Sequence, residues 1–210
     1  MITIGSSIDK STIQQMPQVT YPGTITVVDT VQKAQDALEY LSTLGIIGFD
    51  TETRPSFRKG IVNKTALLQL ASPERAFLFR LNILGLPDFL CRFLADRNII
   101  KVGLSVKDDF SSLRRHCSLA PESFIELQEY VAEIGIEERG LQRLYALLFG
   151  KRISKSQQLS NWEADTLSDG QCQYAAIDAW ACVEIYNYIK ELRLSGTYQI
   201  IKRDAEESNT

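Results

Sequence analysis

The stretch LGIIGFDTE, residues 44–52, predicts the centre of the fold and contains the first candidate site residues. Its first six residues are apolar or glycine, which favours a strand in the middle of a sheet. Asp50 and Glu52 end the stretch, and side chains two apart on a strand point to the same face. The two carboxylates therefore project together. Because acidic residues also end strands that simply reach solvent, this pair alone does not predict chemistry.

Strand and helix patterns alternate on both sides of this stretch. The other predicted strands are 24–29, 65–71, 75–81, 99–104 and 123–128, of which 65–71 and 75–81 form a hairpin. The predicted helices are 31–43, 87–96, 105–117, about 140–149 and about 168–193. Ser168 and Gln171 have the form of a capping box at the start of the last helix. The pattern predicts an α/β fold, a mixed sheet with helices on its faces.

The two ends of the chain are polar. Residues 1–22 are rich in Ser, Thr, Gln and Pro, so we expect an N-terminal arm, with regular structure beginning after Pro22. Residues 23–195 are expected to form one domain, since 210 residues suffice for one substantial core. Residues 196–210 are expected to form a charged tail that is frayed at its end.

Composition and charge limit the class of protein. Hydrophobic residues make up 44% and charged residues 23%, which argues against a disordered chain or a coiled coil. No basic start followed by an apolar stretch opens the chain, and no apolar run approaches roughly 20 residues. We therefore expect a cytoplasmic protein without a membrane partner. Its four cysteines include no Cys-x-x-Cys pair and are expected to be reduced, buried thiols.

A second pair of candidate residues lies in QYAAIDAWACVEIY, residues 173–186. Tyr174 and Asp178 are four apart, so on a helix they share a face. The alternative is a tyrosine at the edge of the core and a solvated aspartate. However, the neighbours of Asp178 are mostly Ala, Ile and Trp, and a buried carboxylate there needs a partner or a metal.

The third candidate is the doublet Asp108-Asp109, just after the predicted strand 99–104. Carboxylates at a helix N-terminus are favoured by the helix dipole, so a purely structural role is the alternative. Consecutive helix positions do not share a face, so at most one of the two is expected to serve a metal.

Together, GFDTE, VGLSVKDDFSSL and QYAAIDAW resemble the three motifs of the DEDDy 3′-5′ exonucleases, of the Werner-type and ribonuclease D-type branches of the ribonuclease H-like superfamily. The resemblance covers roughly residues 25–190, and LSNWEADTLSDGQCQYAAIDAWACVEIY is its most specific part. It implies a ribonuclease H-like exonuclease domain. The implied catalytic residues are Asp50, Glu52, Asp109, Tyr174 and Asp178. Ungapped matching from Val102-Gly103 selects Asp109, whereas matching backwards from Phe110 and Leu113 selects Asp108, which stays as the alternative.

The resemblance also implies a cofactor of two divalent metal ions, Mg²⁺ or Mn²⁺. Asp50 would bridge both ions, Glu52 and Asp178 would complete the first, and Asp109 would hold the second mainly through water. Tyr174 would orient the attacking water, because a phenol with a pKa near 10 is a poor base at neutral pH. Four clustered carboxylates would repel one another without cations, and the single histidine, His116, cannot supply a zinc cluster.

The expected partner is a nucleic acid with an accessible 3′ end, held through its backbone and by base stacking. The candidate substrate-binding residues are Thr51, Phe57, Arg58, Lys59 and Lys107, with Lys151, Arg152 and Lys155 near the site. Each could equally lie in an ordinary solvated loop. Trp162 is expected to be a core anchor. The net charge of −3 argues mildly against a nucleic-acid binder, unless clustered carboxylates bind cations that reverse the local potential.

The expected activity is hydrolysis of phosphodiester bonds from a 3′ end, with release of nucleoside 5′-monophosphates. DNA is favoured over RNA, because the chain ends soon after the last predicted helix and offers no helical RNA-binding domain there. Two alternatives stay open: a ribonuclease D-like RNA-trimming enzyme and a non-catalytic protein that binds nucleic-acid ends. Suitable residues at all five positions favour an enzyme.

Overall fold

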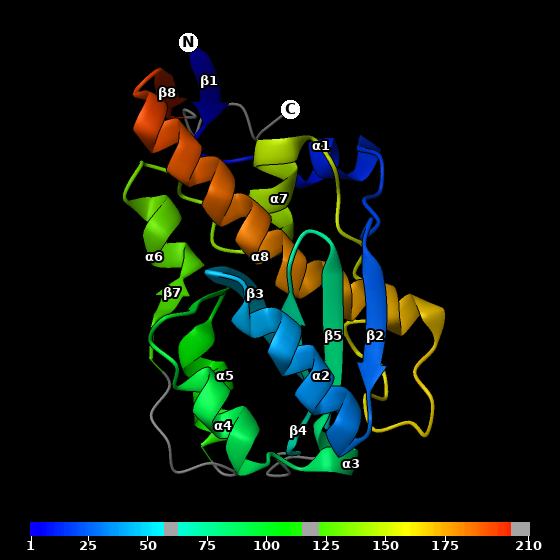
Figure 1. Cartoon of the computed structure of the whole chain (residues 1–210). Helices are drawn as coiled ribbons and strands as arrows, with labels where there is room; N and C mark the ends of the chain where they lie inside the picture. The colour runs from blue at the N-terminus through cyan, green and yellow to red at the C-terminus, as the bar shows by residue number, and fades with distance from the viewer. Residues whose placement is uncertain (57–62, 115–121, 203–210) are drawn as a thin grey trace.

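The computed structural model describes residues 1–56, 63–114 and 122–202, and a six-stranded sheet forms its centre (Figure 1). The strands run in the order β2-β5-β4-β3-β6-β7. They are β2 (Thr24–Val28), β3 (Ile46–Thr53), β4 (Thr65–Ala71), β5 (Arg75–Arg80), β6 (Ile100–Gly103) and β7 (Phe124–Glu126). β3 is antiparallel to β4 on one side and parallel to β6 on the other. The predicted mixed α/β sheet and the central place of β3 are therefore confirmed.

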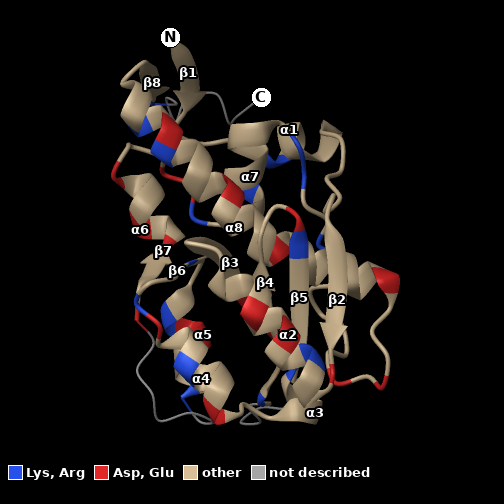
Figure 2. Ribbon diagram, viewed as in Figure 1, with Lys and Arg blue, Asp and Glu red and all other residues tan. Residues whose placement is uncertain are grey.

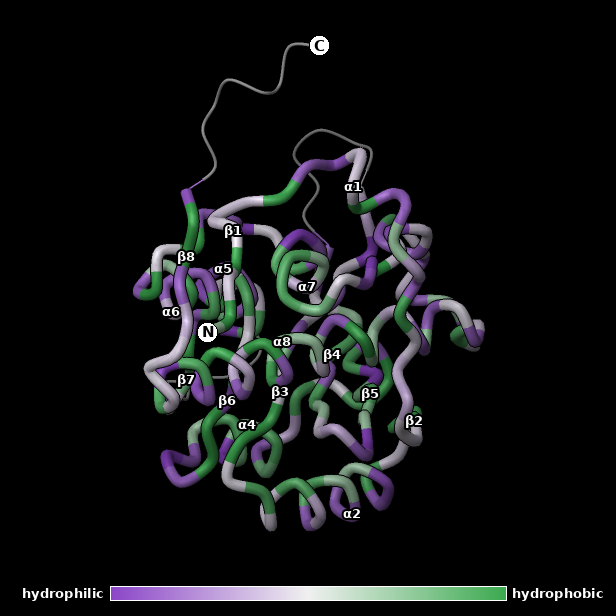
Figure 3. Tube along the Cα trace, turned by 90° about the horizontal axis from the view of Figure 1, so that it is seen from above, coloured by the Kyte–Doolittle hydropathy of each residue, from purple (hydrophilic) through white to green (hydrophobic). Residues whose placement is uncertain are grey.

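Helices cover both faces of the sheet. One face packs against α2 (Val31–Ser42), α3 (Leu81–Leu84), α4 (Asp88–Leu94) and α5 (Val106–Leu113). The other packs against α6 (Leu127–Ala132), α7 (Leu141–Phe149) and α8 (Asp169–Ser195). In Figure 3 the strands and the inner sides of the helices are mostly green, while α2 shows purple turns toward the outside. Ile47 and Phe49 belong to the first face, so Gly48, Asp50 and Glu52 face α8.

Two local features of β3 determine what can lie beside Asp50 and Glu52. α8 crosses the strand so closely at Gly48 that a Cβ atom there would lie 1.9 Å from the carbonyl oxygen of Ala179. β6 pairs only with Ile46–Gly48, so the end of β3 has no strand partner on that side. α5 begins a few residues after β6 ends, near this open edge.

The N-terminal prediction is wrong in one respect: regular structure begins at Ile2 and not after Pro22. β1 (Ile2–Gly5) pairs in parallel with β8 (Tyr198–Ile201), and α1 (Lys10–Gln15) follows. The pairing joins segments nearly a whole chain apart, so no local pattern indicates it. Part of the expected tail is thus a strand, whereas residues 203–210 lie outside the described residues.

Other predictions have clear outcomes. Trp162 is fully buried, as expected of a core anchor, and Ser168 and Gln171 form the predicted capping box. Cys91 and Cys182 are buried and Cys172 is half-buried, and none of the three forms a disulfide among the described residues, while His116 and Cys117 lie outside the described residues. None of the helices in the described part of the chain combines the length and apolar character that crossing a bilayer requires.

Candidate active site

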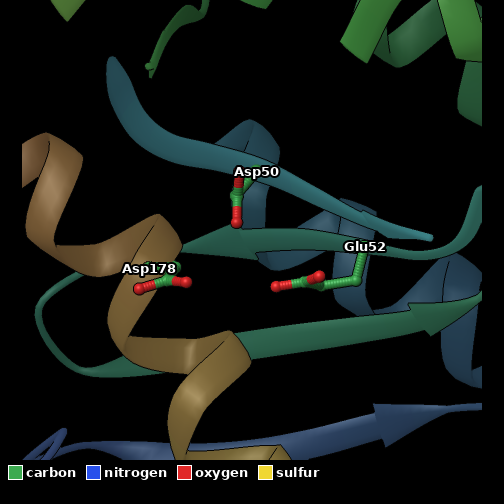
Figure 4. Close-up of side chains that lie close together, drawn as sticks. All are labelled: Asp50, Glu52 and Asp178. Atoms are coloured by element: carbon green, nitrogen blue, oxygen red, sulfur yellow. The ribbon is translucent and has the colours of Figure 1, made fainter. Parts of the chain in front are cut away.

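Three carboxylates meet where α8 lies over β3 (Figure 4). One oxygen from each of Asp50, Glu52 and Asp178 lies within 4.8 Å of the others. The two β3 carboxylates share a face of the strand, and Asp178 reaches them from the helix. The close contact at Gly48 sets the separation of the two elements, since any side chain there would force α8 away.

Asp109 approaches the same cluster from α5. The Thr51 hydroxyl donates a hydrogen bond to its carboxylate, across the open edge of β3. Asp109 is half-buried and its charge raises the pKa values of both β3 carboxyls, whereas Asp108 is exposed. The structure therefore brings Asp109, and not Asp108, to the cluster.

The start of α5 has an unusual backbone. Ser105, which precedes the helix, has a left-handed conformation with φ 61°, which a residue other than glycine rarely adopts. The Glu126 carboxylate accepts hydrogen bonds from the backbone N–H groups of Ser105 at 3.0 Å and Val106 at 2.8 Å. Glu126 thus holds the beginning of the helix that carries Asp109. No local sequence pattern indicates this residue, because the contact joins positions 21 residues apart.

Burial and mutual repulsion raise the pKa values of the β3 carboxyls. The pKa of Glu52 rises to about 9, first through burial and then through the charges of Asp178 and Asp109. The pKa of Asp50 rises well above its ordinary value through the same causes. Removing these carboxyls from water costs free energy unless positive charge compensates it, so the cluster favours either protons or cations.

The carboxyls on the two helices are also shifted. Burial raises the pKa of Asp178 to about 7, and a hydrogen bond from Tyr174 opposes that rise. Burial raises the pKa of Asp109 to about 7, and the hydrogen bond from Thr51 opposes it. One buried oxygen of Asp178, Oδ1, has no hydrogen-bond partner among the described residues. An orphaned oxygen in an all-carboxylate set fits a hard divalent cation such as Mg²⁺ or Mn²⁺.

A cleft of about 340 Å³ opens over the cluster. The residues that line it include Asp50, Thr51, Glu52, Tyr174 and Asp178. Its other polar lining comes from the start of α7 and from the connector before α8, namely Gln142, Arg143, Lys155 and Gln158. Lys155 was predicted near the site. The other three carry no motif signal and come to the cleft only through the packing of α7 and the connector.

The remaining substrate-binding candidates have different outcomes. Lys107 forms an ion pair with Glu129 at 3.2 Å, and both side chains are largely exposed. The guanidinium of Arg152 donates to the carbonyl of Met16 at 3.1 Å. Phe57, Arg58 and Lys59 lie outside the described residues.

Relatives of this sequence are named for 3′-5′ exonuclease activity. The family model described as 3′-5′ exonuclease matches residues 25–193. The bifunctional 3′-5′ exonuclease/ATP-dependent helicase WRN of Mus musculus is 29% identical over 96% of this chain and 15% of its own length. A 3′-5′ exonuclease of Arabidopsis thaliana is 30% identical over 83% of this chain and 64% of its own length. The chain thus spans less than two thirds of either relative.

Solved structures share the fold. The EXO domain of Aedes aegypti Nibbler superposes with a TM-score of 0.77 and 22% identity, over 86% of this chain and 95% of that domain. Escherichia coli RNase D superposes with a TM-score of 0.71 and 24% identity, over 82% of this chain and 46% of that protein. The expected ribonuclease H-like exonuclease fold is confirmed. With a family model matching nearly the whole folded part, this chain belongs to the 3′-5′ exonuclease family.

Proposed function

We propose that this chain is a metal-dependent 3′-5′ exonuclease that hydrolyses phosphodiester bonds at the 3′ end of a nucleic acid and releases nucleoside 5′-monophosphates. One observation carries the proposal: three carboxylates from two family motifs lie within 4.8 Å of one another, beside a fourth. The cleft above them, at about 340 Å³, has the size of a small-ligand site and suits a terminal nucleotide.

The donor set supports a pair of divalent ions. Asp50, Glu52 and Asp178 would hold one ion, and Asp50 with Asp109 would hold the other. When bound, two such cations stabilise the negative charge that develops on the attacking and leaving oxygens. Without cations, the raised pKa values mean that these carboxyls retain protons near neutral pH.

Tyr174 has a positioning role in this proposal. Burial and the charges of Asp178 and Glu52 raise its pKa above the ordinary value near 10. The phenol therefore keeps its proton and acts through its hydroxyl, beside Asp178, to orient the attacking water. Trp162 supports the ring, since the two ring centroids lie 6.0 Å apart.

Replacing Tyr174 with Phe tests this role. Tyr174→Phe should lower turnover by about tenfold to a hundredfold, with a much smaller change in the metal concentration needed for half activity. The measurement is the rate of nucleotide release during a Mn²⁺ titration. Equal turnover in the variant and the native protein would remove the hydroxyl from the mechanism.

We propose DNA as the preferred substrate, with RNA as the alternative. The exonuclease/helicase of Mus musculus aligns with 96% of this chain, whereas ribonuclease D of Haemophilus influenzae aligns with 68% at the same 29% identity. The cleft also contains the amides of Gln142 and Gln158, groups able to bind a 2′-hydroxyl. The preference therefore needs a direct comparison of substrates.

The deciding experiment uses matched DNA and RNA oligonucleotides of one sequence, labelled at the 5′ end. With Mg²⁺ or Mn²⁺ the protein should shorten the DNA stepwise from the 3′ end and should shorten the RNA more slowly. Faster loss of RNA would establish the ribonuclease D-like alternative. Binding of both strands with no shortening in either metal would refute the exonuclease and leave the end-binding protein.

A further inference from the structure

The N-terminal segment, residues 1–22, lies outside the part of the chain that the family model matches. It is nevertheless firmly attached beside the cleft. The backbone N–H of Ile8 donates to the buried carboxylate of Glu138 at 2.8 Å. The guanidinium of Arg143 donates to the same carboxylate and to the carbonyl of Ile8. The segment is therefore joined to the chain just before α7 and to the first turn of α7.

A second attachment lies on the other side of α1. The backbone N–H of Arg152 donates to the carbonyl of Pro17 at 3.0 Å, and the N–H of Val19 donates to the carbonyl of Arg152 at 3.0 Å. α1 thus spans from the start of α7 to the connector after it. In Figures 1 and 3 it lies beside α7, and in Figure 1 it is at the same end of the molecule as β1 and β8.

A groove of about 560 Å³ lies between α1 and these two attachments. Its charged lining residues are Lys10, Arg143, Arg152 and Lys155. Among the described residues that line it, none is acidic, although the chain as a whole has a net charge of −3. Figure 2 shows this concentration as blue segments around α1 and α7.

The groove adjoins the candidate active site. Gln142, Arg143 and Lys155 line both the groove and the cleft over the carboxylates. A chain whose last nucleotide occupies the cleft could continue into the groove without leaving the surface. The cleft is acidic and the groove is basic, so only the groove attracts phosphates without help from metal ions.

We infer that this groove binds the backbone of the substrate strand on the 5′ side of the bond to be cleaved. This inference rests on the proposed exonuclease activity. The occupant is a single strand of nucleic acid, whose phosphates bind the cations that line the groove. Arg143 is already paired with Glu138 and Arg152 is bound to the N-terminal segment. No ion pair within the described part of the chain involves Lys10 or Lys155, so these two exposed lysines supply the most available charge.

The inference makes a quantitative prediction about salt. For a single strand, each phosphate contact adds about 0.7 to the magnitude of the slope of log affinity against log salt concentration. At about 0.1 M salt, the loss of one contact therefore weakens binding roughly fivefold, and the loss of two roughly 25-fold. DNA and RNA should show the same losses, because phosphate contacts do not distinguish the sugars.

The test measures the dissociation constant of a 5′-fluorescent 12-nucleotide single strand by anisotropy between about 0.05 and 0.4 M salt, a range over which phosphate contacts change affinity strongly. A phosphorothioate at the 3′-terminal linkage slows cleavage during the measurement. The variants are Lys10→Gln, Lys155→Gln and the double variant. Lys33→Gln is the control, because Lys33 is an exposed lysine on α2, across the sheet from α7.

Each groove variant should weaken binding about fivefold at 0.1 M salt and lower the slope by about 0.7, and Lys33→Gln should change neither. Equal affinities and slopes in the double variant and the native protein would overturn the inference, as would a native protein that does not bind the strand. If the groove variants weaken binding as expected but the unmodified strand is never shortened, the exonuclease proposal fails and the binding groove stands.

Discussion

The four carboxylates of the candidate site are supported in two different ways. Asp50, Glu52 and Asp178 lie on the central strand and on the 27-residue α8, two elements in direct contact at Gly48. Asp109 lies on α5, an eight-residue helix that starts from the left-handed Ser105. The first three are placed by packed regular structure, whereas the fourth depends on hydrogen bonds from its neighbours. Substitutions around Asp109 should therefore reduce activity only in part, and added metal should restore some of it. Substitution of any of the other three carboxylates should abolish activity.

The largest expected effect is that of Asp50→Asn. Asp50 lies at the centre of the cluster and its loss removes a charge that both proposed metals need. Turnover should fall by at least about a thousandfold, since metal-ion stabilisation of the transition state supplies several kcal/mol. The release of nucleotides from a labelled oligonucleotide measures this.

Asp50→Asn should leave the fold intact, because the buried carboxylate is repelled by its neighbours. We expect its melting temperature without metal to equal or exceed that of the native protein. Asp36→Asn, at an exposed position on α2, is the matched control for turnover. Substantial activity in Asp50→Asn would contradict the central place of this residue.

The second largest effect is expected from a residue that supports Asp109. Glu126→Ala removes the carboxylate that holds the backbone of Ser105 and Val106, so the start of α5 should loosen. Activity or metal affinity should fall about tenfold to a hundredfold, as is usual for residues that support metal ligands. Unlike Asp50→Asn, the loss should be partly restored by raising the Mn²⁺ concentration. A metal titration of the rate tests both statements.

Glu129→Ala is the control for this variant, because Glu129 lies three residues away on α6 and pairs with the exposed Lys107. Removal of an exposed ion pair has little effect on stability. If Glu126→Ala and Glu129→Ala have the same activity and metal dependence, Glu126 does not position Asp109. The proposed difference between Asp109 and the other three carboxylates then disappears.

Metal removal should couple stability to pH. The folded-state pKa values of Glu52, Asp109 and Asp178 lie above their unfolded values, so the folded state binds more protons. Without metal, the free energy of unfolding should therefore decrease as pH rises from about 4, the ordinary carboxyl pKa, toward 9. The decrease above pH 7 belongs mainly to the two β3 carboxyls, because the pKa of Glu52 is about 9 and that of Asp50 is raised well above its ordinary value.

Melting temperatures at pH 5 and pH 8, with a chelator or with Mn²⁺, measure this coupling. Between these pH values we expect the free energy of unfolding to fall by about 2 kcal/mol, after allowance for partial exposure of these groups. A fall of this size would lower the melting temperature by about 4–8 °C. Mn²⁺ should abolish most of the difference by replacing the protons. A metal-free protein that is equally stable at both pH values would contradict the raised pKa values of these carboxyls.

The same contrast between Asp109 and the other three carboxylates explains what could be predicted from the sequence. Alternation along a strand and the four-residue period of a helix are local, so Asp50 with Glu52 and Tyr174 with Asp178 could be paired from their spacing. The choice between Asp108 and Asp109 could not be made that way. It depends on the rotation of α5 against β3, which Thr51 and distant residues determine.

No local sequence pattern indicated the residues that act through long-range contacts. Glu126 reaches α5 from β7, and Arg143 reaches the cleft because Glu138 and the N-terminal segment hold it there. The pairing of β1 with β8 is another such contact, between opposite ends of the chain. Each belongs to the tertiary arrangement and not to a periodic pattern, and for this reason the binding groove emerged only from the structure.

The smallest expected effect, and the finest test of the comparison, is that of Thr51→Val. The substitution keeps the size and branching of the side chain but removes the hydrogen bond to Asp109. A hydrogen bond of this kind contributes about 1 kcal/mol, so activity should fall roughly fivefold. That bond also lowers the pKa of Asp109, so its loss should raise the pKa and make the loss of activity larger at pH 6.5 than at pH 8.5.

Thr51→Ser keeps the hydroxyl and should restore activity and its pH dependence. A Thr51→Val defect that is independent of pH would indicate that Thr51 contacts the substrate and does not act through Asp109.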